Sequence, residues 1–163
     1  MNEKSEIGRV WDIIEKVGVC MLTTRFAGGL RARPLEARPD REAGLIYFVT
    51  GLHSPKEDEI ASAPDVGLVF IDPDDKAYLS ITGRASILRD VEKTKAVWRK
   101  TDEVWWPDGP ASPDVSLLRI EPVTAELWDG PASAAVTAFE FVKARLTGQE
   151  PKLGQNRKTT LKM

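Results

Sequence analysis

Basic and hydroxyl side chains gather where the chain is expected to turn at the ends of strands. Arg31 and Arg33 alternate along one extended segment, Thr50 ends another, and Ser54 and Lys56 follow soon after it. The segment after Ser54 reads as a short helix, whose free N–H groups and dipole could hold a phosphate, with the basic side chains adding charge-assisted hydrogen bonds. Solvated charges at strand ends would produce the same pattern. On the residues alone, the ordinary polar surface is favoured over the phosphate site.

Histidine and cysteine are too scarce for several other kinds of site. The chain has one histidine, His53, and one cysteine, Cys20, so we expect neither an internal disulfide nor a Cys/His metal site. A Ser-His-Asp triad would depend on His53, which we expect to be an exposed residue of the turn GLHSPK. Neither GxGxxG after a strand nor GxxxxGK[ST] occurs, which rejects Rossmann and P-loop nucleotide sites.

Tryptophans form a second group of candidates. Trp105 and Trp106 lie in a proline-stiffened loop, which could be a lid over the core or a platform for a planar ligand or a partner subunit. Trp128 ends the last long strand and either packs within its own domain or reaches a ligand. Trp11 and Trp98 fall on apolar helical faces and are predicted to be core residues.

Length and composition suit one compact cytoplasmic domain. The chain has 163 residues, of which 42% are hydrophobic and 29% charged. Its formal net charge of -2 argues against non-specific nucleic-acid binding. The N-terminus lacks a signal-peptide pattern, and no window approaches the roughly 18 apolar residues of a membrane span. We therefore expect neither nucleic acid nor membrane as a partner.

The hydrophobic pattern predicts a mainly β fold with helices, of the α+β class. The order of elements favours a small antiparallel barrel of about six to seven strands over a βαβ sheet. Gly83 interrupts one strand, where a bulge or a close backbone approach is the usual reason for glycine. Residues 1–147 are expected to form the domain, and the basic segment 148–163 a mobile tail. Helices are predicted over 5–16, 56–63, 90–100 and 132–146, and strands over 19–26, 30–38, 45–50, 66–71, 77–88 and 115–128.

Five segments, in this order, resemble one branch of a known superfamily. They are RARPL, YFVTGLHSPKEDEI, YLSITGRA, WWPDGP and ELW. Together they resemble the general stress protein branch of the pyridoxamine-5′-phosphate oxidase-like superfamily, over about residues 10–146. The resemblance implies an antiparallel split β-barrel, a homodimer, and FMN bound at the subunit interface.

The resemblance also assigns residues to the flavin site. They are Arg33, Pro34 and Leu35 along the flavin, Val49 and Thr50 at the ring edge or ribityl chain, Ser54 and Lys56 at the phosphate, Tyr78 and Ser80 beside the flavin, and Trp128 from the second subunit. Because no second pocket for an adenosine is evident, FMN is expected, with FAD and a deazaflavin left open.

The chain differs from the vitamin-forming oxidase after Trp128. There the segment DGPASAAVTAFEF lacks the arginine and histidine with which that enzyme holds pyridoxamine phosphate, so we expect no pyridoxal-phosphate synthesis. The first hypothesis is a stress-related, flavin-dependent redox protein, in which the cofactor carries the electrons. The alternatives are a noncatalytic protein that stores or senses flavin, and an interaction module without turnover.

Overall fold

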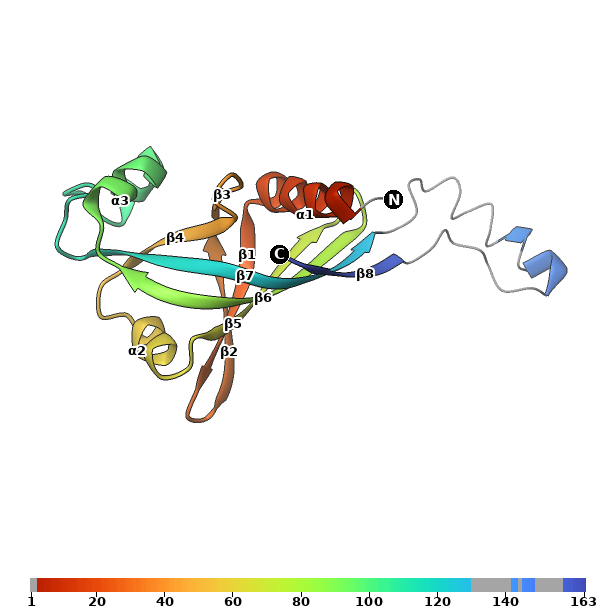
Figure 1. The fold of residues 1–163 in the computed structure, drawn as a ribbon, viewed down its shortest axis with the longest axis horizontal. Coiled ribbons are helices and arrows are strands. Elements are labelled where there is room, and N and C mark those ends of the chain that lie inside the picture. Colours follow the sequence, from red (N-terminus) through yellow and green to blue (C-terminus); the bar gives the residue numbers. More distant parts are fainter. Residues whose placement is uncertain (1–2, 130–141, 144, 149–156) are drawn as a thin grey trace.

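The computed structural model describes residues 3–129, 142–143, 145–148 and 157–163 (Figure 1). The helices are α1 (Glu3–Val17), α2 (Pro55–Ser62) and α3 (Val91–Val97), followed by a 3-10 helix, η1 (Lys100–Val104). The strands are β1 (Val19–Phe26), β2 (Gly29–Glu36), β3 (Arg38–Asp40), β4 (Leu45–Gly51), β5 (Asp65–Asp72), β6 (Ala77–Leu88), β7 (Val115–Asp129) and β8 (Arg157–Lys162).

The described strands form one antiparallel sheet in the order β2-β1-β5-β6-β7-β4-β3, with β8 beside β7. This confirms the prediction of a mainly antiparallel β fold with helices. The sheet has 8 strands, more than the sequence predicts, because β3 and β8 were not anticipated. Among the described residues, no helix is both long and apolar enough to span a membrane.

Strand β8 corrects the prediction of a mobile tail. Along one edge β7 pairs with β6, and along the other it pairs first with β4, up to Ile120, and then with β8, from Thr124 to Asp129. Without β8, the second half of β7 would expose a row of unpaired backbone groups. Leu161 of β8 is buried in the core. Residues 157–162 are therefore part of the sheet, while 149–156 and most of the helix predicted over 132–146 lie outside the described residues.

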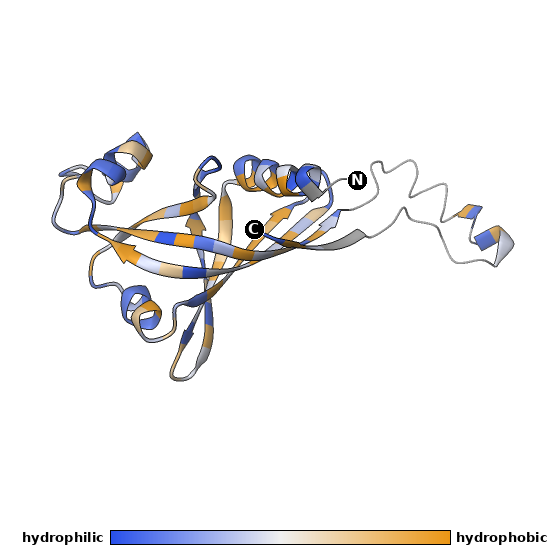
Figure 2. Ribbon diagram, in the orientation of Figure 1, coloured by the Kyte–Doolittle hydropathy of each residue, from blue (hydrophilic) through white to orange (hydrophobic). Residues whose placement is uncertain are grey.

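Helix α1 covers one side of the sheet and supplies part of the core (Figure 1). Its buried residues Val10, Trp11 and Ile14 recur at helical spacing, which confirms the prediction for Trp11. Gly18 ends the helix: its N–H donates to the Ile14 carbonyl at 3.0 Å, and its φ of 72° suits glycine. Hydrophobic and hydrophilic residues alternate along α1 and the strands in Figure 2, as expected for elements with one buried face.

Gly83 lies at the predicted bulge. The register between β6 and β7 shifts there, so that Thr82 lies opposite Thr124 while Gly83 lies opposite Pro122. A Cβ atom on Gly83 would lie 2.7 Å from Cγ2 of Ile120. The strands thus approach too closely at this point for a side chain.

Candidate functional site

The guanidinium of Arg33 is held between the β1–β2 hairpin and α2. Its Nη1 donates to Oγ1 of Thr24 at 3.1 Å and to Oε2 of Glu59 at 3.1 Å, and its Nη2 donates to both Glu59 oxygens. Arg31, two residues away on the same face of β2, forms an ion pair with Glu59 at 3.2 Å. The hydrogen bonds from Arg33 hold the pKa of the buried Glu59 carboxyl below its ordinary value, against the effect of burial.

The start of α2 carries a hydroxyl and an ammonium group for which the described residues provide no hydrogen bond or ion pair. Ser54 precedes Pro55 as the N-cap residue, yet its side chain makes no capping hydrogen bond. Its Oγ atom is buried and has no hydrogen-bond partner among the described residues. Lys56 is half-buried and forms no ion pair with any described residue. Burial, and then the positive charge of Arg33, lower the pKa of Lys56, while the carboxylates of the same helix oppose this shift.

Glu57 of α2 ties the turn before the helix to β7. One carboxylate oxygen accepts from the backbone N–H of His53 at 2.7 Å, and the other from Oγ of Ser116 at 2.6 Å. His53 is exposed, as predicted, and its φ of 56° is unusual for a residue other than glycine. The N–H of Leu52 donates to the carbonyl of Asp114 at 2.8 Å. These bonds hold the strained turn that leads into α2.

A separate hollow lies between β2, β4 and the loop after η1. It has a volume of about 270 Å³, and Pro34, Leu35, Val49, Trp105 and Trp106 line it. We call it the tryptophan hollow. The rest of its wall is charged and comes from Glu36, Arg38 and Asp102. The structure thus brings three residues of the predicted flavin site together with the aromatic loop.

The remaining predicted residues fall into two groups. Thr50 is buried at the end of β4, opposite Ser116, close in sequence to the start of α2. Tyr78 and Ser80 on β6 and Trp128 on β7 lie elsewhere on the sheet, with Tyr78 directly opposite Trp128. None of these three lines the tryptophan hollow. Within one chain, the fold therefore does not bring Tyr78, Ser80 and Trp128 to the residues that line the tryptophan hollow.

Tyr78 belongs to an exposed apolar face of the sheet. The register places it opposite Ile71, and places Val69 opposite Met21, so these side chains share one face across β1, β5 and β6. All four are exposed, as is Val19 at the start of β1. Soluble monomers rarely expose so many large apolar side chains together.

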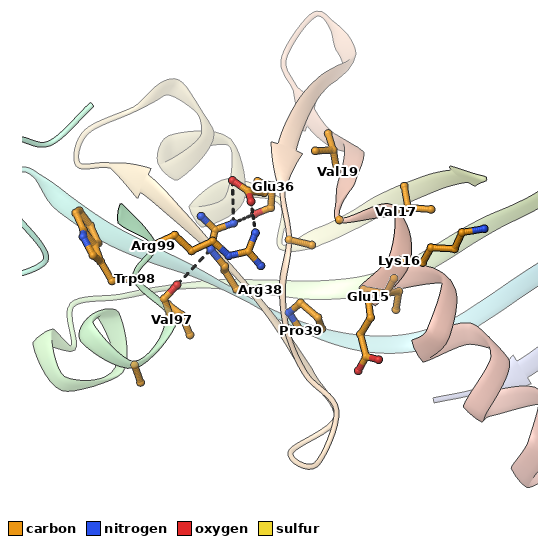
Figure 3. Close-up of a pocket in the computed structure, with 14 residues that line it drawn as sticks. Glu15, Lys16, Val17, Val19, Glu36, Arg38, Pro39, Val97, Trp98 and Arg99 are labelled. Atoms are coloured by element: carbon orange, nitrogen blue, oxygen red, sulfur yellow. Dashed lines mark hydrogen bonds and ion pairs between the residues drawn. The ribbon is translucent and has the colours of Figure 1, made fainter. Parts of the chain in front are cut away.

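A larger cavity, of about 700 Å³, lies between the end of α1, the β2–β3 segment and the end of α3 (Figure 3). Glu36 lies between Arg38 and Arg99 and pairs with both guanidinium groups. Arg38 also donates to the Val97 carbonyl at 3.2 Å and pairs with the buried Asp102 at 2.9 Å. Of the described residues, those lining this cavity include none that the sequence assigned to the flavin.

Sequence reasoning missed Thr24 and Glu59. Thr24 could have been found, because the hairpin register places it directly opposite Arg31 and therefore on the face of the two arginines. The contact between Glu59 and Arg33 depends on how α2 packs against the hairpin, for which the sequence contains no signal.

Two known proteins are similar to this chain in sequence. General stress protein 26 of Bacillus subtilis is 29% identical over 126 residues, which cover 75% of this chain and 87% of that protein. Protein bli-3 of Neurospora crassa is 27% identical over 116 residues, which cover 64% of this chain but only 56% of bli-3.

Solved structures share the fold. A crystal structure from Jannaschia sp. CCS1, assigned to general stress protein 26, has a TM-score of 0.75 and 26% identity, covering 98% of this chain and 99% of that one. The general stress FMN/FAD binding protein of Xanthomonas citri has a TM-score of 0.67 and 22% identity, covering 77% of this chain and 89% of that one. Residues 5–152 match the family described as pyridoxamine 5′-phosphate oxidase like. The chain therefore belongs to the pyridoxamine 5′-phosphate oxidase-like family, together with its general stress protein 26 homologues.

Proposed function

We propose that this general stress protein homologue binds FMN, with the flavin phosphate at the start of α2. The observation that carries the proposal is the Ser54 hydroxyl, which is buried without a partner among the described residues. Such a group costs free energy unless something supplies its hydrogen bond, and a phosphate oxygen would do so. The N–H groups at the start of α2 add a favourable dipole.

Two cations fit the same phosphate. Lys56 is half-buried without an ion pair in the described part of the chain, and the negative charge of a phosphate would oppose the effect of burial, which lowers the pKa of Lys56. Arg33 lies close enough to Lys56 to lower its pKa further, so both positive charges act on one small region. Glu59 offsets part of the Arg33 charge, and a dianionic phosphate would add the counter-charge that Lys56 lacks among the described residues.

With the phosphate at the start of α2, the rest of the flavin would lie along β2 and β4. Pro34 and Leu35 on β2 and Val49 on β4 offer an apolar wall, and Thr50 lies near the start of α2. The flavin binding named for the Xanthomonas citri neighbour supports this choice of cofactor. The bound flavin would supply the electron-transfer chemistry, while these side chains would hold the ring and exclude water.

We also propose that two chains pair and that each completes the site of the other. The exposed apolar face that includes Met21, Val69 and Tyr78 is the support, because pairing would remove it from water. Tyr78, Ser80 and Trp128 would then reach the flavin of the partner. Sedimentation tests this: a dimer is expected, and Val69→Glu should shift it toward the monomer.

Whether the flavin turns over separates an oxidoreductase from a protein that stores or senses flavin. We propose a redox role, with pyridoxamine phosphate excluded as substrate. Repeated reduction and reoxidation of the bound flavin by a nicotinamide donor and oxygen would support the redox role. A flavin that stays oxidised with every donor would favour storage or sensing.

The test of flavin binding is direct. Purified protein should show flavin absorption, and the molecule released on denaturation should have the mass of FMN. Flavin-free protein should bind added FMN at one per chain, measured by equilibrium dialysis. If the absorption spectrum of FMN is the same with and without the protein, and equilibrium dialysis shows no FMN retained by the protein at saturating concentration, the proposal is wrong.

A further inference from the structure

The chain between Asp129 and Arg157 starts and finishes at one end of the sheet. Strand β7 ends at Asp129, β8 begins at Arg157, and the two residues lie directly opposite each other in the antiparallel pair. A two-residue turn would be enough to join strands that are paired in this way. The much longer segment 130–156, which we call the arm, is therefore not needed to close the sheet.

The described part of the arm has an exposed apolar stripe. Residues 142–143 and 145–147 are helical, and the Thr147 hydroxyl donates to the Lys143 carbonyl at 2.8 Å. Val142 and Leu146 lie one turn apart on the same side of this helix, with exposed fractions of 60% and 81%. In Figure 1, the described residues of the arm lie beyond the end of the sheet at which β7 meets β8. An amphipathic helix normally buries such a stripe, yet the described residues leave this one open to water.

The arm begins beside the exposed apolar face of the sheet. The register places Ile71 opposite Tyr78, and Tyr78 opposite Trp128 near the end of β7. Residues directly opposite each other point to the same side of a sheet, so this row continues the face to which Met21 and Val69 belong. A two-fold axis brings the same surface of both chains together. If two chains pair through this face, the base of each arm therefore lies next to the other chain.

Charge and length suit a contact with a second chain. Two basic side chains, Lys143 and Arg145, lie on either side of the apolar stripe of the arm. The turn between β5 and β6 borders the exposed face and carries the exposed carboxylate of Asp74. Opposite charges at the rims of two apolar surfaces favour their association and fix its orientation. The segment from Gly148 to Arg157 can span about 30 Å when extended, which is enough to cross onto a neighbouring chain.

We propose that the arm of each chain packs on a second copy of the chain, with Val142 and Leu146 against the exposed apolar face of that copy. This exchange rests on the proposed pairing of two chains, and it assigns to the interface a segment that lies outside the sheet. It would remove both apolar surfaces from water and enlarge the contact between the chains. Because Trp128 lies shortly before the arm, the exchange would also hold the end of β7 against the other chain, where the flavin role of Trp128 requires it.

Two substitutions in the full-length chain test the apolar stripe. Leu146→Glu places a charge in the proposed contact and should raise the dissociation constant of the dimer about tenfold or more, measured by analytical ultracentrifugation. Thr147→Glu is the matched control, because it adds the same charge at an exposed neighbouring position about 100° around the helix from Leu146. It should change the dissociation constant little. Equal dissociation constants for Leu146→Glu and the parent, or equal effects of the two variants, would overturn the inference.

A further variant removes the arm and keeps the sheet. Residues 130–156 are replaced by the dipeptide Asn-Gly, which favours the two-residue turn that can join Asp129 to Arg157. We expect this variant to unfold cooperatively and to form a dimer with a dissociation constant at least about tenfold larger than that of the parent. A dimer as tight as that of the parent would overturn the inference and leave the proposed pairing through the sheet intact. A parent chain that stays monomeric at every concentration would overturn both.

Cross-linking shows which chain the arm contacts. Chains carrying Leu146→Cys are mixed with longer, tagged chains carrying Val69→Cys and treated with a short bismaleimide. The natural thiol should not interfere, because Cys20 is buried and burial raises its pKa to about 12. We expect a product that joins one chain of each length, and less of it when Thr147→Cys replaces Leu146→Cys. In a chain that carries both substitutions, a link formed only within the chain would show that the arm covers its own sheet, which overturns the inference.

Discussion

Arg33 on β2 and Glu59 on α2 form a close ion pair, in which both terminal nitrogens of the guanidinium lie 3.1 Å from the same carboxylate oxygen. The pair fixes α2 against the hairpin and neutralises much of the charge of Arg33. Lys56, one turn earlier on the helix, has no such partner among the described residues. The two cations near the start of α2 are therefore not equivalent, and Lys56 is the one whose charge most needs a ligand.

Removal of the Glu59 charge should destabilise the flavin-free protein. Glu59→Gln leaves Arg33 and Arg31 without their carboxylate in a partly buried place, so we expect a loss of about 1 to 3 kcal/mol in the free energy of unfolding, measured with urea. Asp58→Asn, at an exposed position of the same helix, is the control and should change little. Equal effects of the two variants would show that the ion pair contributes nothing measurable.

The same pair has a defined pH dependence. The folded protein lowers the pKa of Glu59, so its stabilising contribution is present above the pKa of the unfolded chain and is lost as the pH falls through the lower, folded value. The stability difference between the parent and Glu59→Gln should therefore shrink in acid, in urea titrations at successively lower pH. A difference that stays constant down to strongly acidic pH would contradict this account.

FMN affinity should decrease at alkaline pH. Burial and Arg33 lower the pKa of Lys56 in the free protein, whereas a bound phosphate would favour the charged ammonium. As the pH rises through this lowered pKa, the Lys56 ammonium of the free protein loses its proton. FMN must then either bind a neutral lysine or bind together with a proton, and both weaken its apparent affinity. Titrations from neutral pH upward should show weakening before an ordinary lysine titrates. Lys56→Arg should remove this dependence, and an identical pH profile for the two proteins would contradict the role of Lys56.

Gly83→Ala should destabilise the fold. A Cβ atom there would lie 2.7 Å from Cγ2 of Ile120 and 3.0 Å from the carbonyl oxygen of Glu121, so we expect a loss of about 1 to 3 kcal/mol in thermal or urea unfolding. Gly67→Ala on β5 is the matched control, because its nearest neighbour would be the Thr23 Cβ at 3.8 Å, an ordinary contact. It should be neutral or stabilise by up to about 1 kcal/mol. A larger loss of stability in Gly67→Ala than in Gly83→Ala would refute the close approach at the bulge.

Trp128→Phe should raise the fluorescence of bound flavin. If the partner chain places the Trp128 indole beside the flavin, electron transfer from the indole competes with emission, and phenylalanine is a poorer donor. The comparison requires dimeric protein with FMN at one per chain, and Trp98→Phe serves as the control. Unchanged emission from a fully loaded, dimeric Trp128→Phe protein would remove Trp128 from the flavin site.

Local signals predicted most of the fold. The alternation on both sides of a glycine turn predicted the β1–β2 hairpin, and helical spacing predicted α1. Gly83 indicated the irregularity in its strand, because a bulge or a close backbone approach is the usual reason for glycine within a strand. Strand β8 could not be predicted in the same way. It forms by pairing with the part of the β7 edge that β4 does not cover, and this unpaired edge exists only in the folded sheet.

The same difference between local signals and long-range packing applies to the candidate site. Ser54 and Lys56 could be singled out because a helix start is a local feature that predicts what can bind there. The partner of Arg33 could not, since it depends on how a helix and a hairpin pack. Tyr78 and Trp128 lie opposite each other on neighbouring strands, and their part in the flavin site stays a prediction that involves a second chain.

The measurement that tests the central claim most directly compares FMN with riboflavin, which lacks the phosphate. Lys56→Ala should weaken FMN binding about tenfold or more, because a charge-assisted hydrogen bond contributes roughly 1.5 to 3 kcal/mol, and should leave riboflavin nearly unchanged. Ser54→Ala should act in the same direction with a smaller effect, and Ser62→Ala, at the exposed other end of α2, should have none. Equal losses of both flavins in Lys56→Ala, or no loss of FMN, would contradict a phosphate site at the start of α2.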